Sequence, residues 1–145
     1  MVPEWAGKYV GIPWLTNGRG PEGYDCWGLV RMIAKDQFGW DWPSYDETYT
    51  QGAEADDKSV EDVRESEDSP WQRLDNPDDP LEKKVIGIQT GDVIWLRHRS
   101  HVVHMGLMLD ARRFIHVSMS TDSVISQVDH ILWKNRVVGF YRWKS

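Results

Sequence analysis

The chain has little cysteine, little positive charge and no long hydrophobic run, and each shortage excludes a class of protein. Its 145 residues include one cysteine, Cys26, so no disulfide within the chain can hold the fold together. The 17 Lys and Arg against 23 Asp and Glu give a net charge of −6, whereas nucleic-acid binders gain affinity from basic residues. The longest strongly apolar segments are short pieces such as residues 93–96, far below the length that spans a bilayer. We therefore expect no nucleic-acid partner and no membrane span.

The length and the aromatic content predict one folded domain over residues 1–145. Nine Trp, five Tyr and three Phe can fill a core and still leave aromatic side chains for a binding groove. At the start of the chain, Glu4, Lys8 and two prolines interrupt the apolar stretch that a secretory signal would need. We therefore expect synthesis in the cytoplasm without an export signal.

A helix is predicted from residue 25 to residue 38, directly after a loop rich in glycine and proline. The apolar residues between Cys26 and Phe38 follow helical spacing, and Gly39 is a plausible C-terminal stop. Asp25 is a good N-cap, because its carboxylate can accept hydrogen bonds from the unpaired backbone N–H groups of the first turn. This prediction places Cys26 in the first turn.

Residues 46–84 form an acidic excursion within the domain. They carry 14 acidic and five basic side chains, a local net charge of −9. Few large apolar residues accompany these charges, so the segment cannot build a core of its own. We expect a solvated connection with one short helix around residues 59–66. The alternative is a recognition arm that docks on a basic partner surface.

The second half of the chain has the texture of a β-sheet. Four short runs rich in Val, Ile, Phe, Tyr and Trp, separated by turn-forming or charged residues, predict about four strands. A hairpin turn is expected at residues 110–112. A helix followed by such strands predicts an α+β fold, with the helix packed on an antiparallel sheet. The runs are GDVIWLRH (91–98), HVVHMGLML (101–109), RRFIHVS (112–118) and VVGFYRW (137–143).

Cys26 and two histidines are the candidate chemical groups. A helix N-terminus and a nearby imidazolium lower the pKa of a thiol and make it nucleophilic. A hairpin pivoting at Ala111 would place residue 106 opposite 116 and residue 104 opposite 118, so His104 and His116 become diagonal neighbours on one face, with open space beside Gly106. That arrangement suits a base and the residue that orients it. The alternatives are a small buried cysteine and two half-exposed strand histidines.

A metal site is not expected. His98, His101 and His104 recur at every third position, but alternate strand positions face opposite sides of a sheet. The sequence has no second cysteine and no matching carboxylate spacing. His98 and His101 are expected in the loop before the strand, and His130 on the surface. No cofactor is predicted.

The segment PWLTNGRGPEGYDCWGLVR (13–31) resembles the nucleophile segment of the NlpC-like, papain-fold cysteine peptidases that cut bacterial cell-wall peptides. Residues 91–94, 104–107, 114–117 and 139–142 resemble, in order and spacing, the later strands of that family. The resemblance implies a papain-like α+β fold with Cys26 as nucleophile, His104 as general base and then acid, and His116 as the orienting group. It also implies that Tyr24 and Asp25 border the substrate groove.

Two aromatic residues depart from the secreted members of that family. Trp27 stands where many of them have Ser, and Trp14 stands where they usually have Tyr. We expect both in substrate binding. The Asp-Cys-Trp-Gly-Leu form resembles the branch found in phage and prophage tails, which implies other tail proteins as partners and incorporation into a virion. The expected function is a peptidoglycan stem-peptide endopeptidase. The alternatives are an inactive structural tail-tip protein and a cysteine-dependent acyl transferase or amidase.

Overall fold

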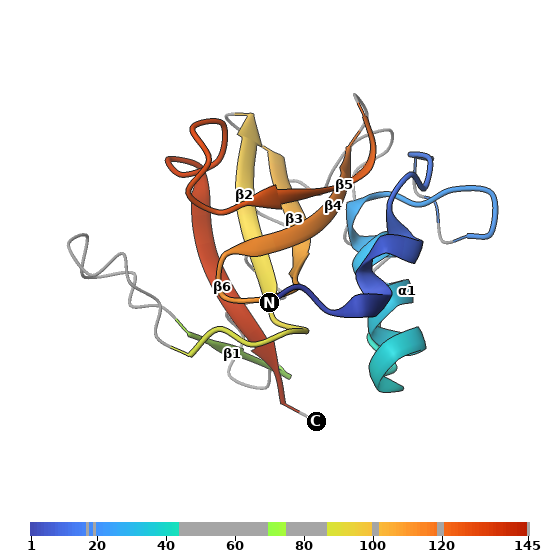
Figure 1. The fold of residues 1–145 in the computed structure, drawn as a ribbon, viewed down its shortest axis with the longest axis horizontal. Coiled ribbons are helices and arrows are strands. Elements are labelled where there is room, and N and C mark those ends of the chain that lie inside the picture. Colours follow the sequence, from blue (N-terminus) through green and yellow to red (C-terminus); the bar gives the residue numbers. More distant parts are fainter. Residues whose placement is uncertain are drawn as a thin grey trace.

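The computed structural model describes residues 1–16, 18, 20–43, 70–74, 87–99, 102–118 and 121–144. Two helical elements come first: a 3₁₀ helix η1 (Glu4–Tyr9) and the helix α1 (Cys26–Phe38). Six strands follow, and α1 packs against β3 and β4 (Figure 1). The strands are β1 (Trp71–Arg73), β2 (Val93–Arg99), β3 (Val102–Met108), β4 (Arg113–Ser118), β5 (Thr121–Gln127) and β6 (Val137–Trp143). The predicted short helix at 59–66 lies outside the described residues.

Both ends of α1 follow the chemistry read from the sequence. The Asp25 carboxylate accepts a hydrogen bond from the Gly28 N–H at 2.6 Å, which satisfies one of the donors left over in the first turn. At the other end Gly39 adopts the left-handed conformation with φ 69°, which a residue without a Cβ reaches at no steric cost. The predicted helix and its caps are confirmed.

The sheet is antiparallel, with strand order β1-β6-β2-β3-β4-β5. The four predicted runs form the inner strands of the sheet, β6, β2, β3 and β4. The two strands that the sequence pattern did not indicate, β1 and β5, lie at the two edges. Edge strands bury less surface, so their sequences need less apolar character. β5 shows this in TDSVISQ, where only Ser123 is fully buried. The count of about four strands was therefore too low.

The hairpin of β3 and β4 has the predicted register. Leu107 pairs with Ile115, and Met108 pairs with Phe114. The turn is held by Asp110, whose carboxylate accepts hydrogen bonds from the N–H groups of Arg112 and Arg113, both at 2.8 Å. Burial acts to raise the pKa of Asp110, but these two donors and the chain's N-terminal amine outweigh it, so the pKa lies below its usual value.

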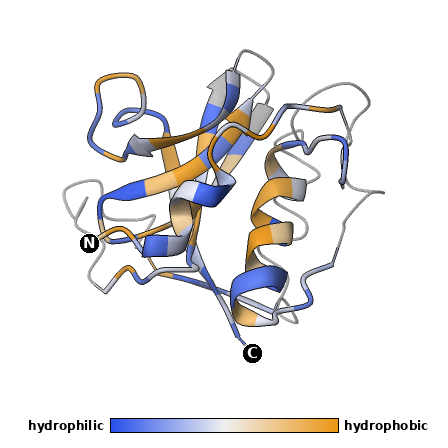
Figure 2. Ribbon diagram, turned by 45° about the vertical axis from the view of Figure 1, so that its right-hand side comes forward, coloured by the Kyte–Doolittle hydropathy of each residue, from blue (hydrophilic) through white to orange (hydrophobic). Residues whose placement is uncertain are grey.

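Apolar side chains form one layer on each side of the central strands. The layer between sheet and helix contains Leu29 and Ile33 of α1 with Leu107 of β3. Figure 2 shows the hydrophobic stripe of α1 turned toward the sheet. The second layer, on the alternate positions of the strands, contains Ile94, Leu96, Met108, Phe114 and Phe140. Residues 104 to 117 of the hairpin therefore contribute alternately to the two layers.

An ion pair joins the start of β2 to the last strand. Two nitrogens of the Arg142 guanidinium donate to the Asp92 carboxylate at 2.9 and 2.8 Å, and Asp92 is 3 % exposed. The same carboxylate raises the pKa of Arg142, and the Gln89 N–H supplies a further donor to Asp92. A two-pronged contact of this kind fixes strand positions as well as charge. Within the described segments, no helix is long and apolar enough to cross a membrane.

Candidate active site

Cys26 is the first residue of α1 and has no solvent-exposed surface. The N-cap Asp25 immediately precedes it and is also buried. The backbone N–H groups of this first turn carry the positive end of the helix dipole, which favours a negative charge on a nearby sulfur. The thiol is therefore enclosed by protein atoms.

His104 and His116 are brought together as predicted. Nε2 of His104 lies 2.6 Å from Nδ1 of His116, and the two side chains are 0 % and 2 % exposed. The contact is diagonal, because the register that pairs Leu107 with Ile115 places Gly106 opposite His116. A hydrogen bond this short between buried imidazoles fixes the orientation of both rings.

The helix that carries Cys26 packs on the strands that carry the two histidines. Cys26 belongs to the same buried cluster as Met105 and Val117, which directly follow His104 and His116 in the chain. The histidine rings alternate with these residues and contact Phe114 and Trp133 of the second layer. The nucleophile candidate therefore lies in the layer formed by the chain neighbours of both histidines.

Ser126 on β5 is a site residue that sequence reasoning missed. Its Oγ lies 2.8 Å from Nε2 of His116. A neutral imidazole carries one N–H, so the hydrogen bonds have a direction: when His104 Nε2 donates to His116 Nδ1, His116 Nε2 donates to Ser126. In this direction Nδ1 is the basic nitrogen of His104. The sequence pattern pointed only weakly to Ser126, because this residue belongs to the polar edge strand β5.

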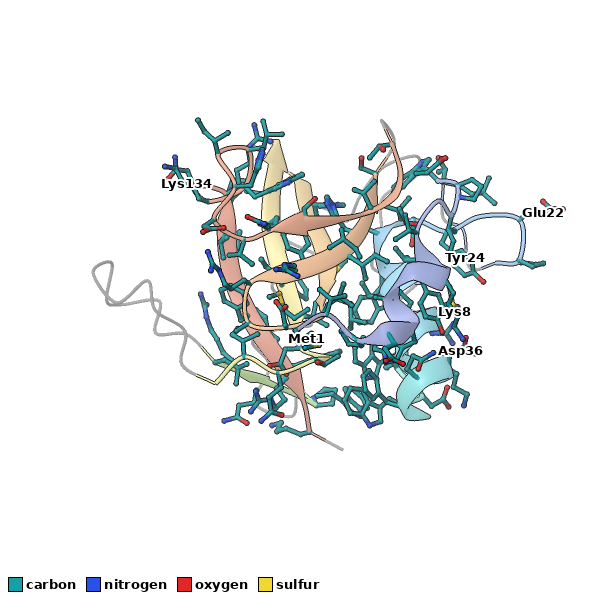
Figure 3. All side chains as sticks on the ribbon, in the orientation of Figure 1. Met1, Lys8, Glu22, Tyr24, Asp36 and Lys134 are labelled. Carbon is teal, nitrogen blue, oxygen red and sulfur yellow. The ribbon has the colours of Figure 1, made fainter. Side chains whose placement is uncertain are left out.

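Trp133 is the second residue that was missed. It lies in the turn between β5 and β6, and its indole stacks on the His104 ring with centroids 5.8 Å apart and planes 23° apart. The same indole meets the His116 ring edge-on, with centroids 5.0 Å apart. Figure 3 shows the neighbouring Lys134 in this turn, on the far side of the sheet from Tyr24 and α1. Nothing in the local sequence links a turn tryptophan to strand histidines.

Trp14 and Tyr24 lie side by side at the entrance to α1. The two residues form a parallel β-bridge: the Leu15 N–H donates to the Tyr24 carbonyl, and the Tyr24 N–H donates to the Pro13 carbonyl. Both side chains remain partly exposed while packing on the core. They are therefore available to a ligand that approaches the N-terminus of the helix.

Trp27 has a packing role in place of the predicted substrate contact. Its side chain is 1 % exposed, stacks on Trp42 and meets Trp71 edge-on, and its indole N–H donates to the Pro43 carbonyl. Trp27 directly follows Cys26 in the first turn of α1, and its side chain points into the buried core. Asp25 is likewise buried, where it caps the helix.

The open space predicted beside Gly106 is absent. A Cβ on this glycine would lie 2.7 Å from the Phe114 ring and 3.3 Å from the Ile94 side chain. The glycine therefore admits the phenylalanine ring, which in turn rests on His116 with centroids 4.7 Å apart. Gly106 acts on the histidine pair through packing.

The remaining histidines lie apart from this pair or outside the described chain. His98 lies within β2, so its predicted place in a loop was wrong. His101 falls outside the described residues. His130 is exposed in the turn between β5 and β6, as predicted. In the part of the chain that the structure describes, no group of three His, Cys, Asp or Glu side chains is arranged to hold a metal ion.

The fold is that of a papain-like domain, and the family comparison agrees. Residues 11–142 match the NlpC/P60 family. This match covers most of the chain, so the protein belongs to the NlpC/P60 family. Helix α1 with Cys26 at its start, packed on the antiparallel sheet, is the fold expected from the sequence.

Two curated relatives align with nearly the whole chain. The gamma-DL-glutamyl hydrolase of Bacillus subtilis is 26 % identical over 149 residues, covering 99 % of this chain and 29 % of the relative. The murein DD-endopeptidase MepS/murein LD-carboxypeptidase of Escherichia coli K12 is 25 % identical over 128 residues, covering 88 % of this chain and 54 % of the relative. The chain thus spans about half or less of each relative.

Solved structures show the same fold. A lipoprotein-like NLP/P60 protein from Staphylococcus aureus superposes with a TM-score of 0.59 at 20 % identity, over 95 % of this chain and 38 % of that one. The NlpC/p60 domain of the peptidoglycan hydrolase SagA superposes with a TM-score of 0.54 at 16 % identity, over 94 % of this chain and 92 % of that domain.

Proposed function

We propose that the protein is a cysteine endopeptidase that hydrolyses amide bonds in the stem peptides of peptidoglycan. The observation that carries the proposal is the 2.6 Å contact between the buried imidazoles of His104 and His116, on strands against which the Cys26 helix packs. A base with an orienting partner, beside a helix that begins with a thiol, is the arrangement that nucleophilic catalysis by cysteine requires.

The proposed reaction uses the tautomer in which His104 Nε2 donates to His116 Nδ1. Nδ1 of His104 takes the proton of the Cys26 thiol, and the sulfur attacks the carbonyl carbon of the amide. The tetrahedral intermediate collapses when His104 gives its proton to the leaving nitrogen, which leaves a thioester and a free amine. His104 then accepts a proton from water, the hydroxide attacks the thioester, and the carboxylic acid and the thiol are restored. The Cys26 backbone N–H stabilises the oxyanion.

His116 and Ser126 keep His104 in the tautomer that this sequence needs. In that tautomer His104 keeps its proton on Nε2 and donates it to His116 Nδ1, which lies 2.6 Å away, while Nδ1 exchanges a proton with the sulfur. Partly exposed Trp14 and Tyr24, next to the helix N-terminus, border the groove that holds the peptide. The substrate class is supported by the relatives, which are named as a murein endopeptidase and a gamma-DL-glutamyl hydrolase.

Incubation with purified peptidoglycan stem peptides tests this function. We expect new amine ends, detected by labelling and mass spectrometry, and none from Cys26→Ala. Products that appear only when an added amine acceptor is present, joined to that acceptor, would identify an acyl transferase. No product, together with alkylation of Cys26 at the rate of a free thiol, would identify a structural protein that has kept the fold.

We also propose that the enzyme works as a component of a phage or prophage tail. The support is the Asp25-Cys26-Trp27-Gly28-Leu29 form, which resembles the tail-associated branch of the family. Particles purified from a producing strain are expected to contain the chain in constant ratio to the other tail proteins, measured by quantitative mass spectrometry. Its absence from particles that still infect would contradict this setting.

A further inference from the structure

Trp133 covers the histidine pair from the side opposite the helix. Its indole is close to parallel with the His104 ring, at 5.8 Å and 23°, and close to perpendicular to the His116 ring, at 5.0 Å and 89°. One side chain therefore contacts both imidazoles of the 2.6 Å hydrogen bond. It also meets Phe114 edge-on at 6.2 Å. The rings of Trp133 and Phe114 therefore both contact the histidine pair.

The turn that carries Trp133 is tied to the sheet at both ends. The Val128 N–H donates to the Arg112 carbonyl at 2.8 Å, and the Arg97 N–H donates to the Arg136 carbonyl at 2.7 Å. Within the turn, the Trp133 N–H donates to the His130 carbonyl. These bonds fix the backbone that holds the indole. The ring therefore meets the histidines as a fixed surface.

We propose that Trp133 is a positioning residue for the reaction: its indole seats the His104 ring and keeps water away from the His104–His116 hydrogen bond. The inference rests on the proposed function, which needs His104 to hold one orientation through two proton transfers. A hydrogen bond in a medium of low dielectric is stronger than one open to water. The face of an indole also attracts a cation, so it favours the imidazolium that His104 becomes during each transfer.

The charged and titratable groups around the pair come from four elements. Strand β4 provides His116 and β5 provides the Ser126 hydroxyl. Helix α1, which packs on β3 and β4, begins with the Cys26 thiol after the Asp25 carboxylate. The turn adds the Arg136 guanidinium, whose carbon lies 6.0 Å from the Trp133 ring centroid. That positive guanidinium competes with the His104 imidazolium for the face of the same indole. The indole is therefore the group on this turn that favours a positive charge on His104.

Trp133→Leu tests the proposal, with Trp143→Leu as the matched control. Trp143 is also partly buried, but its ring packs on Trp42 and Trp71, away from the histidines. For Trp133→Leu we expect kcat on stem peptides to fall about tenfold at constant KM, because a displaced base loses alignment. The alkaline limb of the kcat profile, where the imidazolium loses its proton, should move to lower pH by about half to one unit.

A second readout does not depend on activity. In a Cys26→Ala background, the imidazoles of His104 and His116 are titrated by nitrogen NMR. Trp133→Leu is expected to lower their titration midpoints by about half to one pH unit, and Trp143→Leu to leave them within experimental error. Equal midpoints in the two variants would overturn the inference. Failure of wild-type hydrolysis alone would instead overturn the proposed function, since the titration still measures what the indole does.

Trp133→Phe keeps the test decisive where the leucine variant does not fold. Phenylalanine keeps an aromatic face of smaller area, so its shift is expected in the same direction and smaller than that of leucine. It is compared with Trp143→Phe. A Trp133→Phe protein with wild-type midpoints and a wild-type pH profile, but a lower melting temperature, would assign Trp133 a purely structural role.

Discussion

Replacing His104 with alanine is expected to lower kcat by about 10²–10⁴-fold, the usual contribution of a positioned acid–base group. It should also change the thiol itself. At pH 6 a thiol with the reference pKa of about 8.5 is only about 0.3 % ionised. Pairing with an imidazolium raises that fraction by up to about 300-fold, but an acidic thiolate is intrinsically less nucleophilic, so the rate advantage reduces to about tenfold. The alkylation rate of Cys26 at pH 6 should therefore fall about tenfold in His104→Ala.

The measurement is the rate of carbamidomethylation of Cys26 with iodoacetamide between pH 5 and pH 9. Met108→Ala is the control, because it removes a buried side chain from the same face of β3 without removing an imidazole. Its pH profile should match that of the wild type even where its melting temperature is lower. Identical profiles for wild type and His104→Ala would show that the resting thiol is not paired with this histidine, and the peptidase proposal would fail.

A methyl group at Gly106 is expected to destabilise the fold by about 1–3 kcal/mol, the range for overpacking a filled core. The added Cβ would lie 2.7 Å from the Phe114 ring, 3.1 Å from the Ile115 carbonyl oxygen and 3.3 Å from Ile94. Of these, only the phenylalanine ring can turn away, and it rests on His116. Gly106→Ala should therefore lower kcat as well as the free energy of unfolding.

Urea unfolding of a double-mutant cycle separates the causes. Phe114→Leu removes the colliding ring, so Gly106→Ala should cost less in that background than in the wild type. Gly7→Ala is the control glycine substitution, because a Cβ at Gly7 meets nothing within 4 Å, and its free energy of unfolding should change by less than about 0.5 kcal/mol. A Gly106→Ala protein with the wild-type unfolding midpoint would refute the packing account.

The features that the sequence predicted correctly are those set by neighbouring residues. Asp25 and Gly39 fix the ends of α1 through their own backbone and side-chain chemistry. Asp110 sets a tight turn, and a tight turn fixes the register of β3 and β4 and with it the diagonal contact of the histidines. Each of these choices is local, so a short stretch of sequence is enough to determine it.

The features that were missed depend on what lies across the fold. Three-residue β1 has too few positions to show alternation, and pairing with β6 is what makes it a strand. Trp133 and Ser126 reach the histidines from a turn and an edge strand whose own sequences contain no sign of that contact. Trp27 was predicted to bind substrate after it was noted as a departure from the family pattern, but its side chain stacks on Trp42.

The place of β6 in the sheet has a consequence for synthesis of the protein. A chain synthesised through residue 118 already contains the thiol and both imidazoles, yet the strand that belongs between β1 and β2 has still to be made. Contacts between residues so distant in the chain form late in folding. The sheet is therefore completed only once β6 has been made, because this late strand joins β1 to the hairpin strands.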